Sequence, residues 1–209
     1  MPIDEPLYPV NLRIAGHRCL VVGGGRVALQ KARGLRACGA IVDLVAPSAL
    51  DELQAIADRW EARPYGRGDV RGYRIAMAAT DDATVNAQVH ADGVAHGTWV
   101  NSADQPEACT FVLPSVVRRG PMTIAIGTGG QSPAFATWLR RTIEDLVTDD
   151  HELLLALCAR RRAEVHESGA STEGLDWQSA IAEALACIRR DDRDGAWHAL
   201  VEGTTPAPG

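Results

Sequence analysis

The stretch RCLVVGGGRVALQKARGLRACG, residues 18–39, carries three structural signals in a row. It begins with a short apolar run that stops at three glycines. After the glycines, Val27, Ala28 and Leu35 recur at helical spacing, and Gly39 stands where a glycine commonly ends a helix. The stretch therefore predicts a strand, a tight turn and a helix.

The same alternation continues along the chain. IVDLVAP, residues 41–47, is a second apolar run closed by proline, and a unit of about 30 residues is typical of a βαβ motif. The pattern then predicts a helix at 50–60, a weak extended piece at 61–65, a strand at 74–80, a helix at 85–97 and a strand at 99–103. Strands that alternate with helices favour an α/β fold, a Rossmann-type doubly wound parallel sheet that binds ligands outside the carboxyl ends of its strands.

The alternation of strands and helices ends after residue 104. Two strand-like runs, 111–119 and 121–127, follow each other without a helix and predict a hairpin joined at Arg119–Gly120. A glycine-rich loop then enters a helix, with Ser132 as the expected N-cap and Pro133 as the first helical residue. Residues 149–202 are expected to be wholly helical, and the last residues, TTPAPG, to be frayed. The predicted division is a Rossmann-type domain (1–113), a strand-containing segment (114–148) and a small helical domain (149–209).

The composition excludes several classes of protein. Hydrophobic residues make up 46% of the 209 residues and charged residues 23%, which is ordinary for a folded soluble domain. The net charge is −6 and the longest basic cluster is Arg160–Arg162, so no nucleic-acid partner is expected. Lys31 is the only lysine among 21 basic residues, and no function is inferred from that count. The acidic, proline-containing N-terminus does not resemble a signal peptide, and no apolar run is long enough for a membrane span, so a cytoplasmic protein without a membrane partner is expected.

The five cysteines and six histidines show no metal-binding spacing. The cysteines are odd in number and widely separated, with no CxxC pair, which favours reduced thiols over disulfides or a zinc site. No HExxH motif and no GxSxG motif is present. The sequence therefore predicts no resident metal and offers no covalent nucleophile.

The GGGRVA motif, residues 23–28, fits the GxGxxA dinucleotide fingerprint. Its glycines permit the turn and a close approach to a pyrophosphate, which the helix N-terminus then faces. The predicted cofactor-binding residues are Gly23, Gly24, Gly25, Arg26, Val27, Pro47, Ser48, Thr80 and Asp81. The alternative for the glycines is a tight turn alone, and the alternative for Asp81 or Asp82 is a helix N-cap.

The fingerprint lacks one of its usual members. The acid expected at the end of the second strand is replaced by Ala46, Pro47 and Ser48, and Asp43 lies too far back in the strand. Backbone groups or Ser48 must then hold the adenosine ribose, so the residues alone leave NAD and NADP open.

Two further segments can carry chemistry. GTGGQSP, residues 127–133, presents backbone N–H groups and a helix N-terminus to an anion, assisted by Arg118, Arg119 or Arg140, although a solvated helix face is the alternative for Arg140. NSADQPEACTF, residues 101–111, places Asp104 after a strand, either as a turn-former or as an acid/base group.

Four motifs together resemble one family. LYPVNLRIAGHRCLVVGGGRVALQKARGL, AATDD, VNSADQPEACTFVLPS and IAIGTGGQSPAFATWLRRTIE, in this order and spacing, are similar to the precorrin-2 dehydrogenase / sirohydrochlorin ferrochelatase family of siroheme synthesis. The resemblance covers residues 7–147. The helical remainder is similar only in length to the family's small C-terminal domain.

The resemblance implies an activity and a partner. It implies NAD-dependent oxidation of precorrin-2, a polycarboxylated tetrapyrrole, to sirohydrochlorin, with insertion of Fe2+ to give siroheme in some members. It further implies a homodimer whose interface includes residues 114–148, a catalytic role for Asp104, and a preference for NAD, since the family also lacks the acid after the second strand. The residues expected to bind the substrate are Asn101, Thr128, Gly129, Gly130 and Ser132.

Two alternatives stay open at this level. One is a non-catalytic NAD-binding regulatory module, although such a module usually keeps the acid after the second strand. The other is a dehydrogenase that leaves chelation to a separate enzyme. The methyltransferase fused to some relatives would require an additional stretch of sequence longer than a typical domain. A separate uroporphyrinogen III methyltransferase is therefore expected to supply the substrate.

Overall fold

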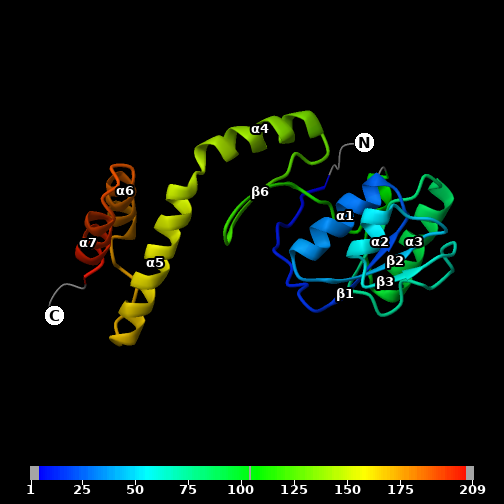
Figure 1. Cartoon of the computed structure of the whole chain (residues 1–209), viewed down its shortest axis with the longest axis horizontal. Helices are drawn as coiled ribbons and strands as arrows, with labels where there is room; N and C mark the ends of the chain where they lie inside the picture. The colour runs from blue at the N-terminus through cyan, green and yellow to red at the C-terminus, as the bar shows by residue number, and fades with distance from the viewer. Residues whose placement is uncertain (1–4, 104, 206–209) are drawn as a thin grey trace. The chain divides into compact units, whose positions relative to one another are not determined.

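The computed structural model describes residues 5–103 and 105–205 (Figure 1). Its strands are β1 (Arg18–Val22), β2 (Ile41–Val45), β3 (Arg59–Glu61), β4 (Ile75–Ala78), β5 (Trp99–Ser102), β6 (Ser115–Arg119) and β7 (Met122–Ile126). Its helices are α1 (Arg26–Ala37), α2 (Asp51–Ile56), α3 (Ala83–His96), α4 (Pro133–Leu146), α5 (Asp149–Glu167), α6 (Trp177–Ile188) and α7 (Arg193–Gly203), with a 3-10 turn, η1, at Pro106–Ala108.

The first five strands form one parallel sheet in the order β3-β2-β1-β4-β5. The chain moves outward from β1 to β2 and β3, then returns to the other side of β1 with β4 and β5. This reversal between β1 and β4 is the topological switch point at which such sheets bind ligands. The predicted doubly wound architecture is confirmed.

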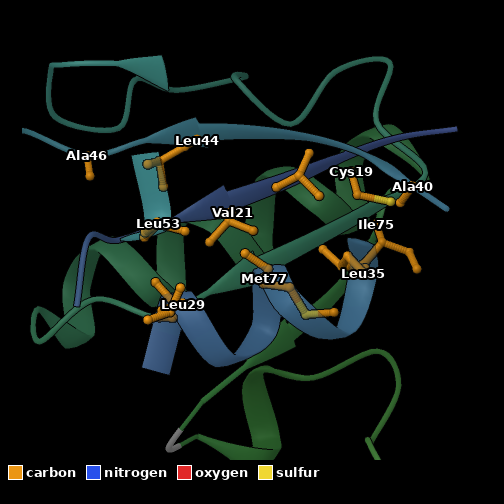
Figure 2. Packing of buried hydrophobic residues seen from close by; sticks show 14 of the residues in the cluster. Cys19, Val21, Leu29, Leu35, Ala40, Leu44, Ala46, Leu53, Ile75 and Met77 are labelled. Carbon is orange, nitrogen blue, oxygen red and sulfur yellow. The ribbon is translucent and has the colours of Figure 1, made fainter. Parts of the chain in front are cut away.

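Side chains of β1 alternate between two cores because neighbouring residues of a strand point to opposite faces. Cys19 and Val21 belong to a cluster with Leu29 and Leu35 of α1, whereas Leu20 and Val22 belong to a cluster with Val89 of α3 and its neighbours. Figure 2 shows side chains of the strands and of α1 pointing into the space between sheet and helix. Burial on both faces explains the uninterrupted apolar run that identified β1.

Contacts divide the chain into two compact units. One comprises residues 1–113 and 127–132, and the other comprises 114–126 and 133–209. In the second unit β6 and β7 pair as an antiparallel hairpin with Arg119 opposite Met122, which confirms the predicted hairpin, and α4 packs on it. Helices α5, α6 and α7 enclose a separate core that includes Leu154, Ala184 and Leu200.

Three local expectations differ from the structure. The helix expected at 50–60 ends at Ile56, because the following residues pair with β2 as β3 and Trp60 donates its indole N–H to Ala46 O at 3.0 Å. The extended piece expected at 61–65 thus begins earlier, at Arg59. The C-terminal region is interrupted between Glu167 and Trp177 and again after Ile188, so it forms three helices and is not continuous. Residues 206–209 lie outside the described residues.

Candidate nucleotide and substrate site

Gly23 and Gly24 are clamped between the segments that follow β2 and β4, the two strands on either side of β1. Gly23 has a φ of 118°, and a Cβ there would lie 2.2 Å from Ala79 O, just after β4. A Cβ on Gly24 would lie 1.8 Å from Ser48 O, and Leu50 N donates to Gly24 O at 3.0 Å. Only glycine fits at either position. The structure therefore brings the glycine loop together with the segments of Ser48 and Thr80, as the predicted cofactor site requires.

Gly25 has the opposite surroundings. It is the N-cap of α1 with extended backbone, and a Cβ there would meet no atom within 4 Å. No side chain caps the helix, and its first turn contains no acid but begins with Arg26. The first N–H groups of a 12-residue helix therefore face open space beside a loop without side chains. This cradle fits a dinucleotide pyrophosphate.

Asp43 is a structural acid. It is 4% exposed in the middle of β2, where its carboxylate accepts from Tyr73 Oη at 2.8 Å and from Arg18 Nε at 2.9 Å. Burial, followed by the hydrogen bond to Asp43, raises the pKa of Tyr73 to about 12. Both neighbours hold Asp43 within the sheet, so it does not substitute for the acid missing after β2.

The residues after β4 divide into two roles. Asp82 caps α3, since its Oδ1 accepts from Thr84 N at 2.8 Å and from Val85 N at 3.3 Å. Thr80 donates its hydroxyl to Asn86 Oδ1 at 2.8 Å. The N-cap is therefore Asp82, while Asp81 lies exposed between Thr80 and the cap.

The segment after β5 folds back onto the strand. Thr110 N donates to Val100 O at 2.8 Å, and Val100 N donates to Thr110 Oγ1 at 2.7 Å. Asn101, 5% exposed, donates to Phe111 O at 3.1 Å and accepts from Lys31 Nζ at 3.1 Å. The expected catalytic residue, Asp104, belongs to this loop in sequence but lies outside the described residues.

Cys109 closes the base of the same loop. Its Sγ accepts from Ser102 N at 3.2 Å and lies 3.3 Å from Ser102 O. Burial raises the pKa of the Cys109 thiol, while the Ser102 amide and the Lys31 ammonium act in the opposite direction. The thiol is thus held protonated, as a structural hydrogen-bonding group and not as a nucleophile.

Two buried polar atoms flank position 104. Among the described residues, the buried side-chain nitrogen or oxygen atoms without a hydrogen-bond partner are Ser102 Oγ and Gln105 Oε1. Such atoms are rare in folded proteins and call for an explanation such as a ligand or a water. Their place beside position 104 supports a binding role for this loop.

The glycine-rich segment after β7 forms a turn. Gln131 N donates to Thr128 O at 3.0 Å, and Gly129 and Gly130 have φ values of 58° and 73°. Contacts group residues 127–132 with the Rossmann sheet, and α4 begins at Pro133 as expected. Two of the arginines expected to assist this segment have partners within the second unit: Arg140 pairs with Glu144, and Arg119 lies 3.0 Å from Asp149 Oδ1.

Metal ligands do not cluster in the part of the chain that the structure describes. No group of three or more His, Cys, Asp or Glu side chains there could hold a metal ion, and the cysteines are free thiols. None of the helices in the described ranges is both long enough and apolar enough to cross a membrane.

Sequence reasoning did not assign a role to Lys31 or Cys109. The only sequence signal at Lys31 was that it is the single lysine of the chain. Its approach to Asn101 spans 70 residues of sequence and depends on how α1 packs against the sheet.

Family models match two parts of the chain. The model described as "Putative NAD(P)-binding" matches residues 10–115, and the model described as "Sirohaem biosynthesis protein central" matches residues 119–146. Together they span the glycine loop, the segment after β5, the β6–β7 hairpin and α4.

Curated relatives named siroheme synthase are similar to most of the chain. The protein of Nitrosococcus oceani is 36% identical over 205 residues, covering 93% of this chain and 44% of the relative. That of Azotobacter vinelandii is 33% identical over 208 residues, covering 95% and 45%. That of Chromobacterium violaceum is 42% identical over 144 residues, covering 67% and 31%. The chain thus spans less than half the length of these relatives.

A solved structure has the same fold along nearly the whole chain. The protein titled "SirC, precorrin-2 dehydrogenase" superposes with a TM-score of 0.70 at 22% sequence identity, covering 94% of this chain and 98% of that one. The arrangement of a Rossmann-type sheet, a small antiparallel sheet and C-terminal helices is therefore shared.

Proposed function

We propose that the chain oxidises precorrin-2 to sirohydrochlorin with NAD+, because it belongs to the family described as "Putative NAD(P)-binding" and is similar to curated siroheme synthases. The observation that carries the proposal is the glycine loop clamped against Ser48 and Ala79, at the switch point of the sheet. The match of residues 119–146 to a sirohaem biosynthesis segment favours this enzyme over a regulatory nucleotide-binding module.

The chain's own groups would hold the cofactor. The N–H groups of the first turn of α1 bind the pyrophosphate, Gly23 and Gly24 let the backbone approach it, and Ser48 faces the adenosine ribose. Bound NAD+ would supply the hydride acceptor. No acid follows β2 to select the ribose hydroxyls, so the preference for NAD rests on the family and is tested by comparing kcat/KM for NAD+ and NADP+.

Asp104 is the proposed proton acceptor. Oxidation of the macrocycle removes a hydride and a proton, and a carboxylate at the carboxyl edge of β5 can take the proton. Asn101, Thr128, Gly129, Gly130 and Ser132 are the proposed contacts to the substrate, whose carboxylates suit the N–H groups of the 127–132 turn. The unpartnered Ser102 Oγ and Gln105 Oε1 support a substrate beside this loop.

The decisive assay supplies precorrin-2 and NAD+ and follows the absorbance and fluorescence of sirohydrochlorin. The protein is expected to accelerate its formation, and Asp104→Asn to lower kcat by about 10²–10⁴-fold because the base is lost. Glu107→Gln, in the same loop, is the matched control and should retain activity. If Asp104→Asn retained the wild-type rate, the proposed role of Asp104 as proton acceptor would be wrong. An inactive wild-type protein would refute the proposed function.

Insertion of Fe2+ into sirohydrochlorin is proposed as a second activity of the same site. Fe2+ is then a substrate, and one base can suffice to remove the pyrrole protons, so a resident metal site is not required. Comparing Fe2+ or Co2+ insertion with and without the protein tests this activity separately.

We also propose a cytoplasmic homodimer whose substrate is made by uroporphyrinogen III methyltransferase activity. The dimer is supported by apolar side chains exposed on α4, where Phe135, Trp138 and Leu146 are 51%, 59% and 66% exposed. The five free thiols suit a reducing compartment. Methyl transfer to the macrocycle is the class of reaction that must precede this one.

A further inference from the structure

The loop between β5 and Phe111 is closed at its base by a compact set of hydrogen bonds. Thr110 and Val100 exchange two bonds, Cys109 bonds the backbone of Ser102, and Asn101 bonds Phe111 O. Every one of these contacts joins a residue before position 104 to a residue after it. The geometry of the loop therefore depends on how rigidly this base is held.

Lys31 is a charged side chain that reaches this base from another element, α1. Its Nζ lies 3.1 Å from Asn101 Oδ1, while the Asn101 amide nitrogen donates to Phe111 O at 3.1 Å and approaches Cys109 Sγ at 3.6 Å. The ammonium thus fixes which way the Asn101 amide faces, because the oxygen must point to the lysine and the nitrogen to the loop.

The choice of residue at position 31 is informative. The other 20 of the 21 basic residues are arginines. A compact ammonium can enter the half-buried space beside Asn101, whereas the larger planar guanidinium requires a wider, bidentate partner. The single ammonium of Lys31 therefore suits this contact with one amide oxygen better than a guanidinium would.

Lys31 also connects the two halves of the site. It lies on α1, whose first turn borders the glycine loop, and it contacts the strand that leads to position 104. We propose that Lys31 is a positioning residue of the dehydrogenase site, which holds Asn101, and through it the β5–Phe111 loop, in register with the nucleotide-binding helix. The inference rests on the proposed function.

The first test uses Lys31→Met, which keeps the aliphatic stem and removes the donor. The kcat for precorrin-2 oxidation should fall by about 10- to 100-fold, since small displacements of catalytic groups have effects of this size. The Kd for NAD+ and the Tm should stay near the wild-type values. Arg33→Met removes a positive charge from the same helix, where the arginine lies 3.9 Å from Glu52, and should leave kcat unchanged.

A double-mutant cycle tests the route of the effect. If Lys31 acts through Asn101, Lys31→Met combined with Asn101→Ala should be no slower than Asn101→Ala alone. Additive losses in the double variant would overturn the inference. A wild-type kcat in Lys31→Met would overturn it as well. A fall in kcat accompanied by a clear fall in Tm or by weaker NAD+ binding would also overturn it, because the lysine would then have a purely structural role.

The sole lysine offers a readout that does not need turnover. Labelling with [ζ-15N]lysine gives one side-chain signal, which should shift in Asn101→Ala and not in Arg33→Met. An inactive wild-type protein would refute the proposed function, and the link would then be judged by this signal: a shift in Asn101→Ala supports the contact, and an unchanged signal overturns it.

Discussion

At the scale of single residues, the three consecutive glycines have different tasks. A methyl group at Gly24 overlaps the backbone of Ser48, whereas one at Gly25 meets only open space. We expect Gly24→Ala to lower the Tm and to lose NAD+ binding, because the backbone must move. Gly25→Ala should keep the Tm but bind NAD+ at least about tenfold more weakly, because the added methyl enters the space where a pyrophosphate approaches. Calorimetric titration and thermal unfolding check both, and full NAD+ affinity in Gly25→Ala would contradict the placement of the cofactor.

The raised pKa of Tyr73 predicts how the stability of the folded protein changes at alkaline pH. The pKa of this tyrosine is raised to about 12 by burial and by the bond to Asp43, whereas an unfolded tyrosine titrates near 10. The folded protein therefore holds this proton more tightly, and the contribution to stability is present below about pH 10 and lost as the pH rises toward 12.

The measurement is the Tm between pH 9 and about 12. Tyr73→Phe should lose less stability over this range than the wild-type protein does, with Tyr8→Phe, a change at an 89% exposed ring, as the control. Identical slopes for wild type and Tyr73→Phe would show that this proton is not linked to folding.

At the scale of elements, α3 starts where Asp82 accepts two backbone N–H groups. Asp82→Ala should destabilise the protein by about 1 kcal/mol, the usual cost of losing an N-cap. Asp81→Ala removes the neighbouring acid, which makes no cap, and should leave the free energy of unfolding unchanged. Urea unfolding compares the two, and equal costs would contradict the assignment of the cap to Asp82.

At the scale of the whole molecule, the exposed apolar side chains of α4 make a prediction about assembly. The only buried side chain of this helix is Ala136, and the ring centroids of Phe135 and Trp138 lie 5.5 Å apart at its surface. Trp138→Glu should weaken the proposed dimer at least about tenfold, because a charge would replace a ring in a desolvated interface.

Sedimentation analysis over a range of concentrations measures the effect. Val94→Glu, on the 62% exposed position of α3, is the matched control and should leave the dimer intact. A wild-type protein that sediments as a monomer at all concentrations would refute the dimer itself.

The sequence by itself determined the Rossmann-type sheet, the glycine loop, the hairpin after residue 113 and the family. These depend on local signals: apolar runs, glycines with required conformations, and motifs in a fixed order. The end of the helix at Ile56 could not be predicted, because the pairing of Arg59–Glu61 with β2 overrides the helical pattern of the segment.

Only the tertiary structure decided which residues meet. It brought Ser48 and Ala79 against the glycine loop, paired the buried Asp43 with Arg18 and Tyr73, and placed Lys31 beside Asn101. Periodicity shows which face of a helix is buried, but not which side chain of a distant strand will lie opposite it. That depends on strand order and helix packing, and therefore the sheet and its helices must fold before the site is defined.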